Sequence, residues 1–283
     1  MLKLKHIRLA AVILAILLSA SFFSACSGNK NSVIVAGSTS VMPYAETLAE
    51  EFMRLNPEIH VAVRGGGSSA GITGVREGIC DIGMSSRELK DNDDERDLLR
   101  EEIALDALAV IVHPSNPVSN LTVEQLRKIY TGEIADWKDV GGKNAKIYVV
   151  TRESGSGTRS AFEELVMNKE RISSKAIVKT ANCTIRHYVS GSKNAIGFVS
   201  LGLVATKKGQ KDVTPLRLDG YEATEENIVL HKTYGLVRSF WFVSLREPEG
   251  AAKEFWDFAV SEAGREILKS KGLIVKGSAD EEF

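Results

Sequence analysis

The sequence predicts an α/β protein with two domains, each built on a mostly parallel, twisted sheet flanked by helices. Three observations lead to this class. The chain has 283 residues, and at roughly 150 residues per domain this length allows about two domains. Segments with the pattern of strands and of helices alternate, which favours parallel sheets covered by helices. Several strands end in a loop of Gly, Ser and Thr that leads directly into a helix.

Composition and charge exclude several classes of protein. The chain is 43% hydrophobic and 26% charged, which is typical of a soluble globular protein and excludes collagen, coiled coil and wholesale disorder. The formal net charge is -1, without the basic excess that a nucleic-acid binder usually shows. Aromatic residues are also sparse, at 7%. We therefore expect no nucleic-acid partner.

Residues 1–25 are predicted to form a lipoprotein signal peptide. Basic residues precede a short apolar run from Leu9 to Leu18, as in a secretory signal, and the run is shorter than the roughly 20 apolar residues that span a bilayer. The small residues before Cys26 resemble a bacterial lipobox, so Cys26 is expected to carry the lipid, palmitate included. Residues 26–31 then form a flexible tether. An uncleaved N-terminal anchor is the alternative.

The first domain is predicted to alternate short strands with helices. The loop after the first strand is Gly37-Ser38-Thr39-Ser40, and the next helix has apolar residues every three or four positions. The second strand runs into the Gly/Ser-rich stretch at 65–71, and the third ends in Ser85-Ser86-Arg87. Strands are expected at 33–36, 59–63, 81–84 and 107–113, and helices at 43–55 and 72–77.

The second domain repeats the arrangement of strand, loop and helix. Thr122 and Gln125 form a possible capping box at the start of a helix. A strand at 145–150 ends in the loop 151–158, a helix follows this loop, and another strand is expected at 195–200. An apolar stretch at 234–243 returns the chain to the first domain, which the C-terminal helices complete.

The recurrent loops predict a site for an anion. A helix N-terminus offers unpaired N–H groups and a partial positive charge, and serine and threonine add hydroxyl donors. Several such loops at the carboxyl ends of parallel strands form an oxyanion site. Arg152 is the best candidate for a charged contact, because its planar guanidinium matches a tetrahedral oxyanion. A surface pair with Glu153 is the alternative. Arg87 has a similar position, but a solvated ion pair on the surface explains it equally well.

Three enzyme or nucleotide motifs match poorly. Residues 67–71 fit G-x-S-x-G, but neither His187 nor His231 stands in a recognisable motif, so a serine hydrolase or phosphatase is a minor alternative. A loose dinucleotide fingerprint at 65–70 has no convincing acid about 20 residues further on. A Walker loop fails because no lysine precedes Thr158.

Cysteine and histidine give no sign of a metal site or of a cofactor. No Cys/His cluster has the spacing of metal ligands, and the chain is predicted to need no cofactor. Cys80 and Cys183 lie far apart in sequence. Export would permit a disulfide between them, but buried free thiols are favoured.

Taken together, the loops resemble the phosphate-binding protein of the bacterial phosphate ABC transporter. The resemblance covers nearly all of the mature chain in order, and several motifs make it specific. The stretches that carry it are Gly37-Ser38-Thr39-Ser40-Val41-Met42-Pro43, residues 65–71, Asp81-Ile82-Gly83-Met84-Ser85-Ser86-Arg87, Arg152-Glu153-Ser154-Gly155-Ser156-Gly157-Thr158-Arg159, residues 130–137 and residues 194–200.

This resemblance implies a two-lobed periplasmic-binding-protein fold of type II that closes on phosphate and docks on a membrane permease. Lobe I would comprise residues 32–113 and 227–283, and lobe II residues 114–226. The protein would be a monomer outside the cytoplasm, held at the cell membrane by its lipid. The implied phosphate contacts are Thr39, Ser40, Ser68, Ser86, Arg152, Ser156, Gly157 and Thr158.

The sequence departs from the family at two positions. Ser86 stands where well-known members have an Asp that accepts the proton of monohydrogen phosphate, which puts the selection against sulfate in doubt. Ser154 replaces an acid that often steadies the arginine, and Glu153 is the candidate substitute. A binder of sulfate, molybdate or tungstate, and an adhesion or signalling lipoprotein, remain alternatives on the same fold.

Overall fold

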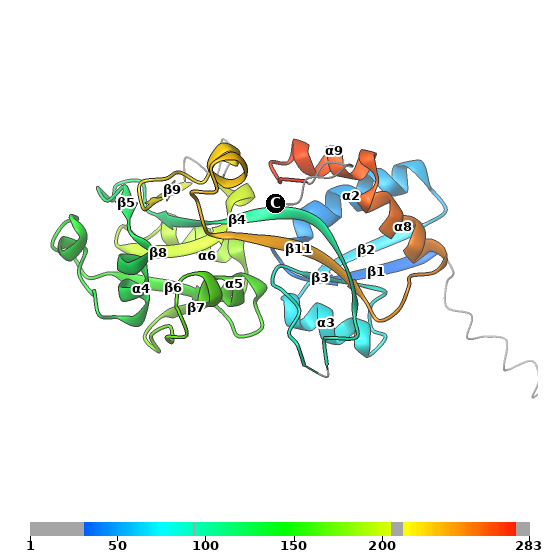
Figure 1. Ribbon diagram of the computed structural model, residues 1–283, viewed down its shortest axis with the longest axis horizontal. Helices are drawn as coiled ribbons and strands as arrows, with labels where there is room; N and C mark the ends of the chain where they lie inside the picture. Colours follow the sequence, from blue (N-terminus) through cyan, green and yellow to red (C-terminus); the bar gives the residue numbers. More distant parts are fainter. Residues whose placement is uncertain (1–30, 93, 205–211, 276–283) are drawn as a thin grey trace, which may run out of the picture.

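The computed structural model describes residues 31–92, 94–204 and 212–275. Figure 1 shows two bodies side by side, joined by the strands β4 (Leu99–Val112) and β11 (Val237–Ser244), which extend from one body into the other. The predicted α/β class with two lobes is confirmed. The signal peptide and the lipidation position Cys26 lie outside the described residues.

A single mixed sheet runs through both lobes. Its strand order is β2-β1-β3-β11-β4-β8-β6-β7, with β9 paired to β4. Pairing is parallel at the two ends of the sheet and antiparallel around the crossing strands β4 and β11. The other strands are β1 (Ser32–Gly37), β2 (His60–Gly65), β3 (Ile82–Ser85), β6 (Tyr148–Arg152), β7 (Ile177–Lys179), β8 (Ala195–Ser200) and β9 (Thr214–Pro215), and a separate pair joins β5 (Asn120–Leu121) to β10 (Arg217–Leu218).

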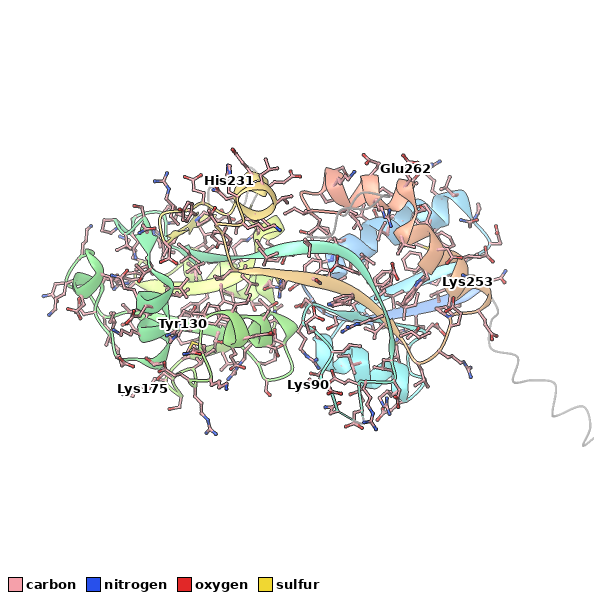
Figure 2. The ribbon with its side chains drawn as sticks, in the orientation of Figure 1. Lys90, Tyr130, Lys175, His231, Lys253 and Glu262 are labelled. Carbon is pink, nitrogen blue, oxygen red and sulfur yellow. The ribbon has the colours of Figure 1, made fainter. Side chains whose placement is uncertain are left out.

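Helices cover the sheet, and each lobe buries an apolar cluster on either face of it. In lobe II, the rings of Phe162 and Phe198 stack with centroids 4.0 Å apart. Tyr130, which is labelled in this lobe in Figure 2, packs against both. In lobe I, Phe52 meets Phe255 edge to face. The helices are α2 (Met42–Leu55), α3 (Ser68–Arg76), α8 (Gly250–Val260) and α9 (Glu262–Ser270) in lobe I, and α4 (Val123–Thr131), α5 (Gly157–Leu165) and α6 (Asn182–Ser190) in lobe II, with short η1 (Trp137–Val140), η2 (Leu201–Leu203) and η3 (Glu226–Leu230).

The division between the lobes falls inside β4. Residues 99–107 of this strand pair with β11, whereas residues 108–112 pair with β8. The side chains of Leu108, Val110 and Val112 accordingly pack into the core of lobe II, as do Tyr234 and Leu236. The chain therefore enters lobe II near Ala107 and leaves it near Val237. Lobe II is thus longer at both ends than the predicted range 114–226.

Local signals in the sequence set several element boundaries. The predicted helix at 43–55 is α2, and the predicted strand at 195–200 is β8. At the start of α4, Gln125 N donates to Thr122 Oγ1 at 3.0 Å and Thr122 N donates to Gln125 Oε1 at 2.9 Å, which confirms the capping box. Strand β4 begins at Leu99 and not at 107, because its first half is defined by pairing with β11, a long-range contact.

Candidate functional site

Three buried serines of lobe I lie together, and we call Ser38, Ser68 and Ser86 the serine cluster. Ser38 follows β1 and Ser86 follows β3; because these strands are parallel neighbours, their carboxyl ends lie side by side. The Ser38 hydroxyl donates to Ser86 Oγ at 2.8 Å. Ser86 N donates at 3.0 Å to Ser68 Oγ, on the first residue of α3. Three separate loops thus place their hydroxyls in one spot.

Arg152 lies at the end of β6 and is 1% exposed. Its Nε and Nη2 donate to the two carboxylate oxygens of Glu153 at 2.9 and 2.8 Å, so Glu153 steadies the arginine in place of Ser154. Arg152 Nη1 is buried without a hydrogen-bond partner. A buried donor on a charged group is costly when unpaired, so this atom is suited to an anionic acceptor.

The first turn of α5 adds further donors. Ser156 is the N-cap, and its Oγ accepts from Arg159 N at 3.3 Å, which leaves the Ser156 hydroxyl proton available. Gly157 and Thr158 open the helix, where backbone N–H groups have no partner within the helix and the helix dipole is positive. This turn therefore attracts negative charge.

Hydrogen bonds join the two lobes at this site. Ser40 Oγ and Thr158 Oγ1 lie 2.7 Å apart, and Ser69 N donates to Gly155 O at 3.1 Å. Ser40 and Ser69 belong to lobe I, while Gly155 and Thr158 belong to lobe II. The structure is thus in a closed arrangement.

Gly157 is the point of closest approach between the lobes. A Cβ at this position would collide with the hydroxyl oxygens of Ser68 and Ser86. Only a residue without a side chain lets the first turn of α5 reach the serine cluster. This contact brings the predicted residues of the two lobes together. Their order along the sequence does not show that they meet.

The structure gathers most of the predicted site residues in one place. Contacts between the lobes join Ser40, Ser68, Ser86, Gly157 and Thr158, and Arg152 and Ser156 belong to the same loop as the last two. Thr39 precedes Ser40 in the same loop, and its Oγ1, like Arg152 Nη1, is buried without a hydrogen-bond partner.

An ion pair between β4 and β11 lies beside the site and was not predicted. Arg238 faces Asp106 across the two strands, and its Nε and Nη2 donate to Asp106 Oδ2 at 3.1 and 2.9 Å. Arg238 Nη2 also donates to Ser40 Oγ at 3.1 Å. Burial raises the pKa of Asp106, while the Arg238 guanidinium and the Ser200 hydroxyl act against this rise. A lone acid or base inside an apolar strand is the sequence signal that could have revealed the pair.

Asn182 is a second residue that the sequence did not single out. It opens α6 of lobe II, is 1% exposed, and its Nδ2 donates to Ser40 Oγ of lobe I at 2.7 Å. Asn182 Oδ1 is buried without a partner. No sequence signal marked this position, since an Asn in a helical first turn is ordinary.

Arg87 has a structural role next to the site. It is buried, and its two terminal nitrogens each donate to a carboxylate oxygen of Glu95 at 2.8 Å. Arg87 Nη1 also donates to Glu88 O at 2.7 Å. The alternative of a solvated surface pair is wrong, because both partners are buried, and the guanidinium is occupied by Glu95.

A groove of about 480 Å³ opens between the lobes on one side of the site. Thr39 and Asn182 line it where it borders the site residues, and Arg186 and Lys271 supply positive charge. Cys183 also lines it and is an exposed free thiol, whereas Cys80 is a buried one. Both thiols are free as predicted, but the expectation that Cys183 is buried was wrong.

No hydrogen bond joins a histidine of the described residues to the serine cluster. His231 Nε2 contacts Glu226 at 3.2 Å, and it lies on the outer edge of lobe II (Figure 2). His113 contacts Ser115, and His187 is exposed on α6. Ser68 makes its side-chain contact with another serine, Ser86. The described residues therefore pair neither Ser68 nor Ser69 with a histidine base.

Comparison with known proteins identifies the family of the chain. A model of the PBP superfamily domain matches residues 24–263. The phosphate-binding protein PstS of Borreliella burgdorferi is 32% identical over 273 residues, which cover 93% of this chain and 97% of that protein. The chain belongs to the phosphate-binding protein family.

Other members of this family are also similar to the chain. PstS of Bacillus subtilis is 30% identical over 246 residues, 86% of this chain and 80% of that protein. A putative phosphate ABC transporter substrate-binding protein from Clostridium perfringens, solved with bound phosphate, is 40% identical with a TM-score of 0.81. The match covers 87% of this chain and 100% of that one.

Two further observations limit the chemistry of the described chain. In residues 31–92, 94–204 and 212–275, no three His, Cys, Asp or Glu side chains gather in a way that could hold a metal ion. Over the same residues, no helix has the length and apolar character needed to cross a bilayer.

Proposed function

We propose that this protein captures inorganic phosphate outside the cytoplasm, in the cleft between its lobes, and delivers it to the permease of an ABC transporter. The observation that carries the proposal is that closure brings the serine cluster of lobe I against the first turn of α5, in the same loop as Arg152, whose buried Nη1 has no partner. The names of the relatives, which are phosphate-binding proteins, support the same ligand.

The chemistry of the site suits a dehydrated anion. A buried charge is tolerated only when its lone pairs are satisfied, and serine and threonine hydroxyls, backbone N–H groups and one guanidinium provide many donors. The nearest carboxylates are already engaged, Glu153 by Arg152 and Asp106 by Arg238. The site therefore presents donors to the ligand without a competing free negative charge.

Binding and closure are coupled in this arrangement. Ser40, Ser68 and Ser86 belong to lobe I, and Arg152, Ser156 and Thr158 to lobe II, so an anion makes its full set of contacts only when the lobes are closed. A ligand shifts a conformational equilibrium by its differential affinity for the two states. Phosphate would therefore stabilise the closed form, which the permease would recognise.

The cellular setting follows from the N-terminus. After cleavage before Cys26, the acylated cysteine would hold a monomer at the membrane, facing the extracytoplasmic side, with residues 26–31 as the tether. Mass spectrometry of the protein from a membrane fraction tests this: Cys26→Ser should abolish the lipid adduct and release the protein into the soluble fraction.

Two alternatives use the same fold. Sulfate, molybdate or tungstate could occupy a site of similar donors, and competition titrations separate them from phosphate. A serine hydrolase or phosphatase is disfavoured by the contacts of Ser68, which involve serine and no histidine. Turnover of a chromogenic ester that is lost in Ser68→Ala and in Ser69→Ala would revive it.

The deciding experiment is calorimetry of the protein without residues 1–25 and with Cys26→Ser. We expect saturable binding of one phosphate per chain, together with a smaller radius of gyration in X-ray scattering when phosphate is present. Arg54→Ala, at an exposed ion pair with Glu51, is the control and should bind as the parent does. Absence of phosphate binding in a folded sample would refute the proposal.

A further inference from the structure

One buried oxygen at the site can only accept a hydrogen bond and has no donor. Among the described residues, the buried side-chain oxygens without a partner are Thr39 Oγ1, Thr151 Oγ1 and Asn182 Oδ1. The two threonine hydroxyls can donate as well as accept, whereas an amide oxygen only accepts. Buried polar groups are normally paired, so Asn182 Oδ1 requires a donor from elsewhere.

The contacts of Ser40 account for the orientation of the Asn182 amide. Ser40 Oγ lies 3.1 Å from Arg238 Nη2, which can only donate, and 2.7 Å from both Asn182 Nδ2 and Thr158 Oγ1. With the two nitrogens donating to its lone pairs, Ser40 gives its single proton to Thr158. The Thr158 proton is then available to a ligand, and the amide oxygen of Asn182 is left over at the same site.

The other acceptors around the site are already occupied. Both carboxylate oxygens of Glu153 accept from Arg152. The oxygens of Asp106 accept from Arg238 and from Ser200. Gly155 O accepts from Ser69 N. Within this set of donors, Asn182 Oδ1 is the acceptor that remains open to a hydrogen carried by the ligand.

We propose that Asn182 accepts the proton of a singly protonated oxyanion, such as monohydrogen phosphate, and thereby selects it over fully ionised tetrahedral anions. This inference rests on the proposed function and names the protonation state of its ligand. Near neutral pH inorganic phosphate keeps a proton, whereas sulfate has none. A sulfate oxygen opposite Oδ1 would place two acceptors together without a hydrogen, and sites built to bond a ligand O–H reject analogues that lack it.

The neutral amide provides this selection where Ser86 cannot. A serine hydroxyl rotates and can donate to sulfate or accept from phosphate, so it does not discriminate between the two. Asn182 lies on the opposite lobe and reaches the site only after closure, through its contact with Ser40. The choice between anions would thus be made in the closed state.

The test compares phosphate and sulfate affinities of the purified protein by calorimetry at one near-neutral pH. In Asn182→Ala, phosphate loses an acceptor for its proton, and we expect the ratio of phosphate to sulfate affinity to fall by about 10- to 100-fold. In Asn182→Asp, the carboxylate still accepts the proton, so the ratio should be kept or increased even if both affinities fall. Cys183→Ala, at an exposed neighbour in the same groove, should leave the ratio unchanged.

Several results would overturn the inference. One is a ratio in Asn182→Ala within about twofold of the parent, since losing the contact to Ser40 weakens both anions alike. Another is a fall of the ratio in Asn182→Asp to the level of the alanine variant. A parent protein that binds sulfate as tightly as phosphate would reject the role of Asn182 while leaving oxyanion capture intact. A parent that binds neither anion would reject the proposed function as well.

Discussion

Arg238 and Asp106 lie opposite each other on the two strands that cross between the lobes, and Arg238 Nη2 extends from this pair to Ser40 Oγ at 3.1 Å. The pair is buried, with side-chain exposures of 3% and 1%. It therefore links the crossing strands to the hydroxyl that meets Thr158 and Asn182 of lobe II.

Asp106→Asn should destabilise the protein strongly, because it leaves the Arg238 charge buried without a counter-charge. Breaking a buried pair in this way costs about 3–5 kcal/mol. Urea denaturation without phosphate measures the change. Glu163→Gln removes the partner of Arg159 in a partly exposed pair on α5 and should cost less than about 1 kcal/mol. Equal costs for the two variants would contradict the structural role of Asp106.

Arg152→Ala should weaken phosphate binding, because it removes Nη1, a buried donor on a charged group that has no hydrogen-bond partner. The loss of a charge-assisted hydrogen bond is about 1.5–3 kcal/mol, which corresponds to roughly 10- to 150-fold in affinity. Calorimetry gives the value directly. Arg217→Ala, at an exposed pair with Glu222, provides the comparison, and an affinity of Arg152→Ala equal to that of this control would reject the assignment.

Gly157→Ala should hold the cleft open. The added Cβ would collide with the hydroxyls of Ser68 and Ser86 only in the closed state, so phosphate affinity should fall while folding is retained. Overpacking costs of about 1–3 kcal/mol predict a loss of roughly 5- to 150-fold. X-ray scattering with saturating phosphate should show the variant staying larger than the parent.

The matched control for this variant is Gly235→Ala, where an added Cβ has no neighbour within 4 Å. It should bind and close as the parent does. If Gly157→Ala also closes fully on phosphate, the approach of α5 to the serine cluster does not limit closure.

The pair Arg87–Glu95 should make stability depend on acid pH. Burial of Glu95 raises its pKa, but the Arg87 hydrogen bond and the Lys90 N–H outweigh this, so the pKa lies below the usual 4.5. A carboxylate with a lowered folded pKa stabilises the protein above its unfolded pKa, and this stability is lost as the pH falls through the folded value.

Denaturation from neutral pH downward tests this dependence. Glu95→Gln should be less stable than the parent at neutral pH, and the difference should shrink below about pH 4.5. Glu51→Gln, at an exposed pair with Arg54, should follow the parent closely. A difference for Glu95→Gln that stays constant with pH would count against the ion pair.

The two described thiols should react at very different rates. Burial and the nearby Asp81 raise the pKa of the Cys80 thiol to about 11, and little thiolate forms near neutral pH. Cys183 is exposed and should be alkylated first, with Cys80 reacting only after unfolding. Peptide mass mapping distinguishes them, and equal labelling in the native protein would show that Cys80 is accessible.

Much of the fold and part of the site could be predicted from local sequence. The Ser/Gly loops after the strands, the capping box at Thr122 and Gln125, and the charged group Arg152 are all encoded by neighbouring residues. Such features depend on hydrogen bonds within a few positions, which sequence patterns record. Buried strand β8 was located correctly because its apolar run is continuous.

The remaining features depend on pairs that are far apart in the chain. Arg238 is 132 residues from Asp106, and Asn182 is 142 residues from Ser40. No local pattern shows which buried acid will face which buried base. The first half of β4 was missed for the same reason, since its pairing with β11 brings together distant segments.

The sequence by itself determined the α/β class, the loops that carry hydroxyl donors, and Arg152 in one of these loops. These features depend on residue types that lie close together in the sequence. Only the tertiary structure decided how the loops meet. It brought Gly157 against the serine cluster and placed Arg238 on Asp106 beside Ser40. It also left Asn182 Oδ1, which can only accept, buried without a partner. The physical reason is that a buried polar atom finds its hydrogen-bond partner through contacts between residues that are far apart in the chain. No local sequence pattern records those contacts.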